Sequence, residues 1–374
     1  MKRKWYEHLF KWLFGRFPGD PVPLVPSHDT PIYENATATV VEGKSTHKVE
    51  VVEVKLEPHD NADTLSIVRV DNYVVCVRSS DWSDGDLGAY IPPDSLVPLD
   101  HPSFAFLQVD EGKTQHRVKA KRLRGVMSMG LLVPAPEGSQ IGEDVAEILG
   151  VEHYEPKVSQ QVTMGLAEKD PTGREIPKYD VDTAYKYAKR LLTEGEPLWI
   201  SEKIHGANSR FIWTQGRMWC GSQKQWKSPN HPSTWWDMTV KYPQIVEFCE
   251  SHPDCVLYGE VYGAVQNLKY GHKQGEVSFA AFDILDENYN WLPPAMMYGA
   301  CQALDIPVVP IVEMQYEDWT WDELFALADR RTAVTGANHI AEGVVIRPLE
   351  ERRDPKFGRV QLKIVSNAYL EKKG

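Results

Sequence analysis

The sequence predicts an α+β protein in which an OB-like β-barrel precedes a second domain with antiparallel or mixed sheets and flanking helices. At 374 residues the chain is long enough for two domains, and its 42% hydrophobic and 25% charged residues are typical of a folded protein. Short β-like segments separated by turn residues fill the first part. Strands and helices mix in the second part without long regular βαβ repeats. We therefore expect two domains with separate cores.

The first 36 residues are expected to form an extension and a linker. One helical face carries Trp5, Leu9, Trp12 and Leu13, which indicates a short amphipathic helix that docks on the body of the protein or on something else. The stretch FPGDPVPLVPSHDTP indicates an extended linker. The prolines and few aliphatic residues of the segment 150–172 place the boundary between the two domains there. The predicted regions are 1–36 for the extension and linker, 37–155 for the OB-like domain and 156–374 for the second domain.

The expected strands of the first domain are 48–56, 65–70, 73–78 and 130–133. Among them, HRVKAKRLRG (116–125) gathers basic residues in an otherwise acidic chain. An extended backbone would place Arg117, Lys119 and Lys121 on one face. This face is either a solvated strand surface or a groove that follows phosphates, as OB-folds provide for nucleic acids. The segment alone leaves both interpretations open.

The second domain begins with a predicted helix at 182–193, whose apolar residues recur at helical spacing. Further strands are expected at 198–204, 211–214, 256–258, 277–285, 343–346 and 360–365. Further helices are expected at 242–251, 293–304 and 321–330.

Net charge and cysteine usage restrict the class of protein. A formal charge of −12 argues against a protein that coats nucleic acid nonspecifically, although it allows a local basic groove. The five cysteines show neither a CxxC pair nor metal-ligand spacing, which favours reduced thiols and a cytoplasmic location. No apolar run approaches the ~20 residues that a membrane span needs. We expect no membrane association and no protein partner.

Five short motifs of the second domain place charges in or beside apolar strands, where desolvation needs compensation. They are SEKIHGAN with Lys203, LYGEVYG with Glu260, SFAAFDIL with Phe282 and Asp283, AEGVVIRP with Glu342 and Arg347, and VQLKIVS with Lys363. Taken singly, each charge is more often a solvated group or a salt-bridge partner, and a phenylalanine in such a strand is more often a core residue. Their combination in this order changes that interpretation.

The ordered set Lys-x-x-Gly, Gly-Glu, Phe-Asp-Ile, Glu-Gly-Val-Val-Ile and Leu-Lys resembles the motifs of the covalent nucleotidyltransferase superfamily. That superfamily contains ATP-dependent DNA ligases, RNA ligases and messenger-RNA capping enzymes. EKIHGAN is similar to the RNA ligase 2 branch, since DNA ligases and capping enzymes typically carry Asp where His205 stands. The barrel in front of the transferase domain, with KAKRLRGVMSMGLL, is similar to the RNA ligase 5 group. The resemblance covers about residues 37–370 and implies an ATP-grasp-like ligase fold for the second domain.

The resemblance implies a role for each motif residue. Lys203 would be the nucleophile that forms a lysyl-AMP phosphoramidate from ATP, with Mg²⁺ or Mn²⁺ as the second cofactor. Only about one lysine in two thousand is neutral at pH 7, and we expect neighbouring cations and desolvation to reduce that penalty. The other expected nucleotide contacts are Glu202, Asn208, Glu260, Phe282 as the adenine stack, Arg347 and Lys363. The expected metal ligands, acting through water, are Glu260, Glu342 and Asp283, with a structural carboxylate as the alternative role for Asp283. Gly206 would allow close backbone approach or an unusual turn.

Three departures from the resembled pattern affect the substrate contacts. The arginine that ligases often carry about twenty residues after the nucleophile is absent, and Gln223 and Lys224 occupy that region, so Lys224 becomes a candidate RNA contact beside the basic segment. Gln361 stands where some relatives have a second lysine, and Arg359 or Lys356 could substitute. Arg347 occupies a place where relatives carry lysine, which is not equivalent in geometry.

The resulting expectation is an ATP-dependent RNA ligase that acts on RNA or an RNA-containing nicked duplex, with an RNA 3′-OH end by analogy. The alternatives are a DNA ligase, a capping-type guanylyltransferase or a noncatalytic RNA-binding protein. His205 and the front position of the barrel disfavour the first two, and the joint presence of Lys203, Glu260, Glu342 and Lys363 disfavours the third.

Overall fold

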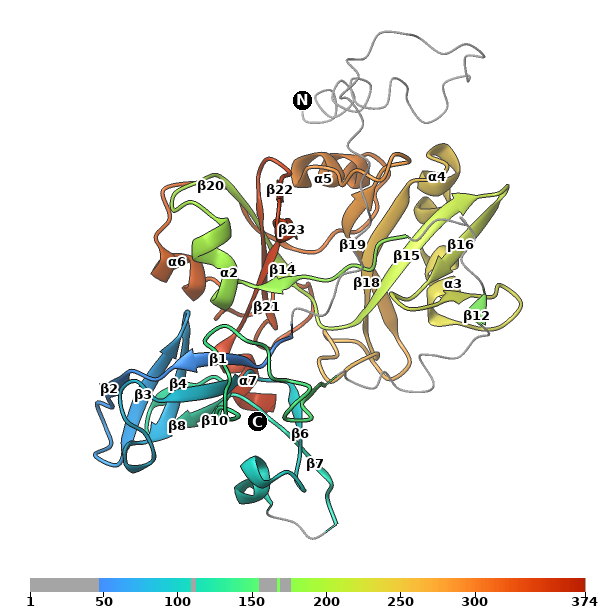
Figure 1. Cartoon of the computed structure of the whole chain (residues 1–374). Helices are drawn as coiled ribbons and strands as arrows, with labels where there is room; N and C mark the ends of the chain where they lie inside the picture. The colour runs from blue at the N-terminus through green and yellow to red at the C-terminus, as the bar shows by residue number, and fades with distance from the viewer. Residues whose placement is uncertain (1–46, 109–111, 155–166, 169–175, 374) are drawn as a thin grey trace.

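A computed structural model describes residues 47–108, 112–154, 167–168 and 176–373 (Figure 1). The expected N-terminal helix, the proline-rich linker and most of the expected boundary segment lie outside the described residues. In the described part of the chain, no helix is long and apolar enough to cross a membrane.

The first module is built from short antiparallel strands that curve around two adjoining cores. Its three-stranded sheets are β1-β5-β10, β2-β3-β4 and β11-β6-β7, and β8 pairs with β9. The strand bounds are β1 Glu50–Glu53, β2 Leu56–Pro58, β3 Leu65–Val70, β4 Tyr73–Arg78, β5 Leu87–Ile91, β6 Ser95–Pro98, β7 Gln115–Arg117, β8 Lys121–Leu123, β9 Val126–Ser128, β10 Leu131–Pro134 and β11 Glu152–His153. Short 3₁₀ helices span Ser79–Asp81 and Pro102–Leu107.

Alternation of apolar and exposed residues explains these strands. Val75 and Val77 of β4 are buried while Arg78 is exposed, and β3 and β4 have the predicted bounds. The single predicted strand at 48–56 divides into β1 and β2. The expectation of a small all-β module in front is confirmed.

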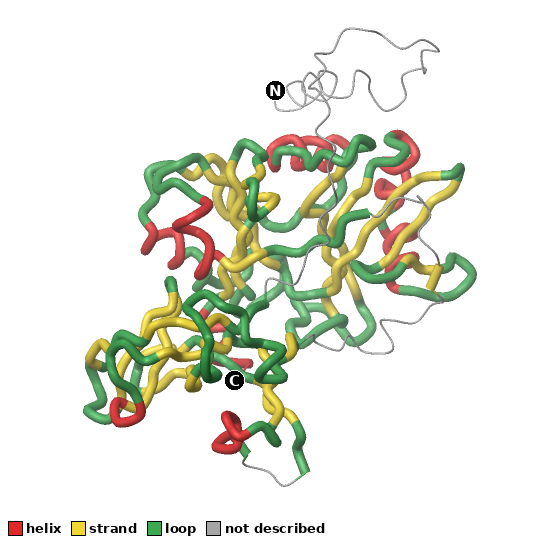
Figure 2. The backbone as a smooth tube through the Cα atoms, viewed as in Figure 1, coloured by secondary structure: helices red, strands yellow, loops and turns green. Residues whose placement is uncertain are grey.

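The second module contains two sheets side by side (Figure 2). The six-stranded sheet has the order β12-β17-β16-β15-β18-β19 and is antiparallel throughout, whereas the five-stranded sheet β13-β24-β21-β14-β20 includes one parallel pair, β13 with β24. The bounds are β12 Ala167–Glu168, β13 Asp182–Thr183, β14 Leu198–Lys203, β15 Ala207–Thr214, β16 Arg217–Gly221, β17 Trp226–Lys227, β18 Val256–Gly263, β19 Val277–Leu285, β20 Ile311–Tyr316, β21 Gly343–Pro348 and β24 Leu362–Val365. A small hairpin joins β22 Arg353–Asp354 to β23 Gly358–Arg359.

Helices cover the sheets where their apolar faces find a partner. The bounds are α2 Ala184–Leu191, α3 Thr234–Lys241, α4 Pro243–Ser251, α5 Pro294–Ala303, α6 Trp321–Ala326 and α7 Asn367–Lys373. Buried residues of α3, α4 and α5 pack on the six-stranded sheet, and those of α2 and α6 pack on the five-stranded sheet. A capping box between Thr320 and Glu323 starts α6. The predicted α+β class with antiparallel and mixed sheets is confirmed.

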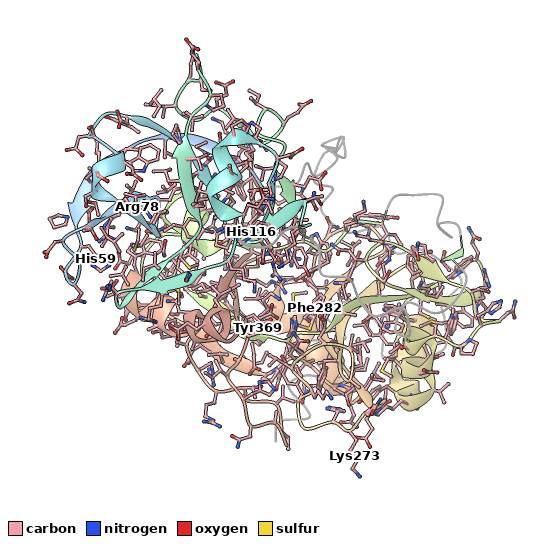
Figure 3. All side chains as sticks on the ribbon, turned by 90° about the horizontal axis from the view of Figure 1, so that it is seen from below. His59, Arg78, His116, Lys273, Phe282 and Tyr369 are labelled. Carbon is pink, nitrogen blue, oxygen red and sulfur yellow. The ribbon has the colours of Figure 1, made fainter. Side chains whose placement is uncertain are left out.

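The two modules share contacts along α2 and α7. Tyr73 donates a hydrogen bond through its hydroxyl to Thr183 Oγ1 at 3.0 Å, and Lys186 forms an ion pair with Glu50. On α7, Leu370 packs against the core of the first module and Glu371 pairs with Arg122. Viewed from below, Tyr369 of α7 lies where the modules meet (Figure 3). The C-terminal helix therefore connects the first module to the five-stranded sheet, which the chain leaves at β24.

Candidate active site

Lys203 is the last residue of β14, at the edge where the two sheets of the second module come together. In the five-stranded sheet Lys203 pairs with Gly343, and Val345 pairs with Lys363, so Lys203 and Lys363 share one face. A Cβ at Gly343 would lie 2.0 Å from the carbonyl oxygen of Ile364, so glycine is required beside the lysine. The sheet register thus brings together two lysines that are 160 residues apart in sequence.

Glu342 supplies the nearest negative charge. Its Oε2 atom lies 2.9 Å from Lys203 Nζ and 3.4 Å from His205 Nδ1, and the residue is 8% exposed. Burial alone would raise the pKa of the Glu342 carboxyl, but Lys203 and His205 outweigh burial and lower the pKa to about 2. Glu342 is therefore ionised at neutral pH and holds both side chains of the KIHG motif.

The protonation of Lys203 differs from the expectation of an activated amine. Burial lowers the pKa of the ammonium, but the Glu342 and Glu260 carboxylates outweigh burial and the net pKa is raised. At Lys363 the balance is opposite, because burial and the Lys203 charge lower its pKa. The lysine is therefore held charged, so its activation requires a group that cancels the carboxylate charge.

Glu260 and Asn208 face each other on the six-stranded sheet, next to the lysine. They are paired in register on β18 and β15. A Cβ at Gly206 would lie 2.2 Å from the carbonyl oxygen of Val261, which confirms the expected close backbone approach. Burial raises the pKa of Glu260 to about 8, against the opposing effect of Lys203. The carboxyl groups of Glu342 and Glu260 therefore both lie near Lys203, and at neutral pH Glu342 carries the negative charge.

The residues present fit a hydrated divalent cation held partly by a nucleotide. Asn208 Oδ1 is buried without a hydrogen-bond partner, beside the Glu260 carboxylate. Oxygen donors of this kind suit Mg²⁺ or Mn²⁺. Within the described ranges, no three His, Cys, Asp or Glu side chains group closely enough to hold a metal alone. Such a site would need phosphate oxygens and water to complete it, as Mg²⁺ sites in nucleotide-binding proteins usually do.

Phe282 occupies an irregular position on β19. Asp283 pairs with Tyr258 and Ala281 with Gly259, which leaves Phe282 as the extra residue of a β-bulge. Its ring centroid lies 4.5 Å from that of Tyr179, and the side chain is only partly buried. The bulge turns an aromatic ring out of the regular pleat, as a base-stacking role would require.

Asp283 and Arg347 contact each other in a buried network of ion pairs. Asp283 is completely buried, and its oxygens contact Arg347 Nη1 at 3.3 Å and Arg359 Nη1 at 2.6 Å. Tyr179 donates to the same carboxylate at 2.8 Å. Arg347 is 3% exposed and also binds Glu351 and the carbonyl oxygen of Leu292. These contacts place Asp283 inside a buried network of ion pairs, in which the Nε atom of Arg347 has no hydrogen-bond partner among the described residues.

The contacts of this network also concern the residues that could replace the missing second lysine. Arg359 binds Asp283 and Glu351, so it does not substitute. Gln361 accepts a hydrogen bond from Tyr179 and donates one to the carbonyl oxygen of Asp180. Lys356 is exposed in the β22–β23 turn. Among these positions the structure describes no replacement cation beside Lys363.

Glu202 faces away from Lys203, as alternation along β14 requires. One carboxylate oxygen accepts a hydrogen bond from the Thr332 hydroxyl, and the other accepts one from the Ala333 amide at 2.7 Å. The side chain is 1% exposed. In this state Glu202 fixes the 332–333 loop, so any contact with adenine would have to be made alongside these two bonds.

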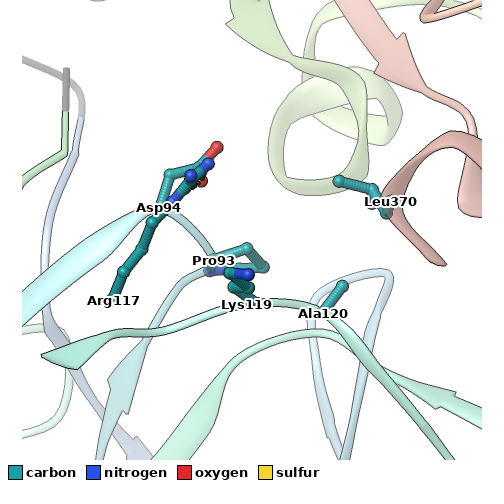
Figure 4. A pocket seen from close by; sticks show the side chains of 6 residues that line it. All are labelled: Pro93, Asp94, Arg117, Lys119, Ala120 and Leu370. Atoms are coloured by element: carbon teal, nitrogen blue, oxygen red, sulfur yellow. Dashed lines mark hydrogen bonds and ion pairs between the residues drawn. The ribbon is translucent and has the colours of Figure 1, made fainter. Parts of the chain in front are cut away.

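The candidate RNA-binding residues are spread over two places. Buried Val118 and Ala120 alternate with exposed Lys119 and Lys121, but β7 and β8 belong to different sheets, so the segment is not one continuous strand. Arg117 forms an ion pair with Asp94, and its guanidinium lies 3.8 Å from the ring centroid of Tyr154. Figure 4 shows Arg117 and Asp94 at a small hollow that Leu370 of α7 also lines. Lys224 is exposed in the β16–β17 turn, and Gln223 donates to the carbonyl oxygen of Tyr179.

Two tyrosines that contact residues of the candidate site were not predicted from the sequence. Tyr179 lies in the segment before β13, outside all five motifs, although it contacts both Phe282 and Asp283. Tyr270 lies in the β18–β19 connection, and its hydroxyl accepts a hydrogen bond from the His205 amide at 2.7 Å. The hydroxyl of a buried tyrosine usually forms a hydrogen bond, so a buried tyrosine can mark a polar site. One sequence does not reveal which tyrosines are buried.

Comparisons with known proteins agree with this architecture. Residues 196–365 match the RNA ligase family, and residues 47–135 match an OB-fold domain. A variant of Naegleria gruberi RNA ligase with ATP and Mn aligns with a TM-score of 0.74 at 22% identity, covering 87% of this chain and 98% of that one. The same ligase with PPi aligns with a TM-score of 0.73 at 24% identity, with the same coverage of 87% and 98%. No curated protein matches the chain in sequence.

Proposed function

We propose that this chain, which carries an OB-fold domain in front of an RNA ligase domain, joins 3′-hydroxyl and 5′-phosphate ends by an ATP-dependent reaction through a covalent lysyl-AMP at Lys203. The match of residues 196–365 to the RNA ligase family supports the reaction class. Similar structures of Naegleria gruberi RNA ligase variants hold ATP with Mn or AMP with Mn, which supports the nucleotide and the metal. The single observation that carries the proposal is Lys203 at the junction of two sheets, 2.9 Å from Glu342 and on the same face as Lys363.

In the first step the neutral amine of Lys203 attacks the α-phosphorus of ATP. A P–N bond forms, the bond between the α-phosphorus and the bridging oxygen breaks, and pyrophosphate leaves. Lys203 must first lose a proton, and its raised pKa opposes this loss. Lys363 lies on the face of the sheet that carries Lys203, where it can neutralise phosphate charge as the transition state forms.

A divalent metal ion would cancel the carboxylate charge that raises the pKa of Lys203, and would stabilise charge on the α-phosphate. We assign it to Glu260, Glu342 and the unpaired Oδ1 of Asn208. Phe282 offers its ring to adenine, which contributes on the order of 1–3 kcal/mol for a stacked base.

In the second step an oxygen of the 5′-phosphate attacks the phosphorus of lysyl-AMP, the P–N bond breaks and the Lys203 amine is regenerated. In the third step the 3′-hydroxyl loses its proton and attacks the adenylated 5′-phosphate, which forms the phosphodiester and releases AMP. We propose RNA or an RNA-containing nicked duplex as the substrate, with Lys119, Lys121 and Lys224 as backbone contacts. Arg117 would contact RNA only by exchanging its bond to Asp94. None of the five cysteines, all of which lie in the described ranges, forms a disulfide, in keeping with a cytoplasmic location.

Labelling with α-³²P-ATP and Mg²⁺ or Mn²⁺, followed by a denaturing gel, tests the nucleophile. We expect a labelled wild-type band and none for Lys203→Ala, whereas Lys224→Ala, in an exposed turn, should label as wild type. Label on Lys203→Ala at the wild-type rate would refute the covalent role. A chase with nicked duplexes that vary RNA and DNA on each side then tests the substrate. Labelling from GTP would indicate a capping activity, equal sealing of all-DNA nicks a DNA ligase, and RNA binding without labelling a noncatalytic protein.

A further inference from the structure

The connection between β18 and β19, residues 264–276, folds over the turn that carries the nucleophile. Tyr270 accepts a hydrogen bond on its hydroxyl from the His205 amide at 2.7 Å. Gln266 donates from its side-chain amide to the carbonyl oxygen of Gly206 at 3.3 Å. Two side chains of one loop therefore hold the backbone of the KIHG turn on both sides of the His205–Gly206 peptide.

This turn is the point where the chain leaves one sheet and enters the other. Lys203 ends β14 in the five-stranded sheet, and Ala207 begins β15 in the six-stranded sheet. Tyr270 belongs to the loop between β18 and β19, both in the six-stranded sheet. Its hydrogen bond therefore ties the nucleophile end of one sheet to the sheet that carries Glu260 and Asn208.

Tyr270 is itself held rigidly in an unusual conformation. It is 1% exposed and has a φ of +49°, which a bulky residue adopts rarely and at a cost in strain. Its ring packs edge-on against His339 at 4.6 Å and Tyr262 at 5.2 Å between ring centroids. At the next position, a Cβ on Gly271 would lie 2.4 Å from the carbonyl oxygen of Gly336. A strained, immobile tyrosine whose hydroxyl meets the turn after the nucleophile indicates a positioning function.

We propose that Tyr270, assisted by Gln266, is a positioning residue that fixes the approach of Lys203 to the α-phosphate. This inference rests on the proposed adenylylation by Lys203. The hydroxyl of Tyr270 is engaged by the His205 amide and not by the Lys203 amine, so Tyr270 acts through the backbone of the turn. Misplacing a reacting group by about 1 Å can slow a reaction about a hundredfold, so a backbone tie of this kind affects the rate.

The test compares Tyr270→Phe with Tyr262→Phe in single-turnover labelling at several ATP concentrations. Tyr262 is a matched control, because it is a tyrosine packed against Tyr270 whose hydroxyl bonds Ser278 and not the turn. We expect Tyr270→Phe to lower the maximal rate about tenfold and to change the half-saturating ATP concentration less than about threefold. The Tyr262→Phe rate should stay within about twofold of wild type. Rates are normalised to the final amount of bound AMP, which counts the folded molecules.

Each outcome decides the question. Equal rates for Tyr270→Phe and wild type, or equal losses in both tyrosine variants, would overturn the inference. A lower endpoint with an unchanged normalised rate would show a merely structural role and would also overturn it. Gln266→Ala removes the hydrogen bond to the Gly206 carbonyl oxygen and should also lower the labelling rate. This variant provides the test if Tyr270→Phe does not fold. Wild-type protein that takes up no label would instead refute the proposed function.

Discussion

Replacing Glu342 with glutamine should shift the pH dependence of lysine adenylylation to lower pH. Glu342 lies 2.9 Å from the Lys203 ammonium, and it is the nearer of the two carboxylates that raise the pKa of that lysine against the effect of burial. Glutamine keeps the size of the side chain and removes its charge. The ammonium form of Lys203 then loses its main stabilising partner, while the effect of burial remains.

The size of the expected pH shift follows from the distance between the Lys203 amine and the Glu342 carboxylate. Two unit charges at 2.9 Å attract each other by about 6 kcal/mol at an effective dielectric constant of 20. Each pH unit corresponds to about 1.4 kcal/mol, so the unscreened interaction amounts to about four pH units. The Lys203 side chain is 27% exposed, and water therefore screens part of the attraction. We expect the midpoint of the pH profile to move lower by about 1–2 pH units, while the plateau rate also falls because Glu342 is a candidate metal ligand.

The assay is the initial rate of ³²P-AMP incorporation at ATP concentrations well below saturation, measured between about pH 5.5 and 10, since this regime reports the ionisations of the free enzyme. Glu313→Gln is the control, because Glu313 lies on β20, on the other side of β14 from Glu342. Its midpoint should equal that of wild type. A Glu342→Gln midpoint at or above the wild-type value would refute the electrostatic reasoning, whatever happens to the plateau.

The buried charges and the basic segment make three further predictions. Asp283→Ala should lower the free energy of unfolding in urea by about 3–5 kcal/mol, because it removes the buried carboxylate that Arg347 and Arg359 share and leaves Glu351 as the one carboxylate between them, and a loss below about 1 kcal/mol would contradict the network. Because the pKa of Glu260 is raised from 4.5 to about 8, the wild-type protein should lose stability as pH rises through that window, and Glu260→Gln should remove this loss in melting curves; a parallel pH trend in both proteins would count against the raised pKa. If Lys119 and Lys121 contact RNA phosphates, each alanine variant should reduce the slope of log affinity against log salt by about one, and an unchanged slope would exclude the contact.

Strands were predicted with correct bounds where the apolar run and the flanking turn residues indicate the same boundaries. β3, β4 and β19 appear with the predicted bounds because their apolar runs are flanked by clear turn residues. α3 was missed, since TWWDMTVK combines aromatic and β-branched residues and becomes a helix through packing of Trp235 and Met238 on the six-stranded sheet. α7 was missed because its stability comes from the contacts of Tyr369 and Leu370, which no local pattern contains.

For the candidate site, motif order identified residues but not the direction in which their side chains point. Lys203, Glu342 and Lys363 come together because strand register places them at one edge. Arg347 stands on the same strand as Gly343 but four residues further along, where it meets Asp283 in the interior. A charged residue in a motif looks the same in sequence whether it serves a ligand or a buried ion pair, and only tertiary contacts separate the two.

The contribution of α2 and α7 to the first module has a consequence for how the chain unfolds. Tyr185 and Leu370 pack into the hydrophobic cluster that contains Val68, Val75 and Tyr90 of the barrel. Part of the barrel's core is thus supplied by residues that lie far along the chain, and melting the second module would leave that core open to water. Calorimetry should accordingly show one cooperative unfolding transition that includes both modules. The two modules are drawn as separate bodies in Figure 1, but we expect them to unfold together because they share this hydrophobic cluster.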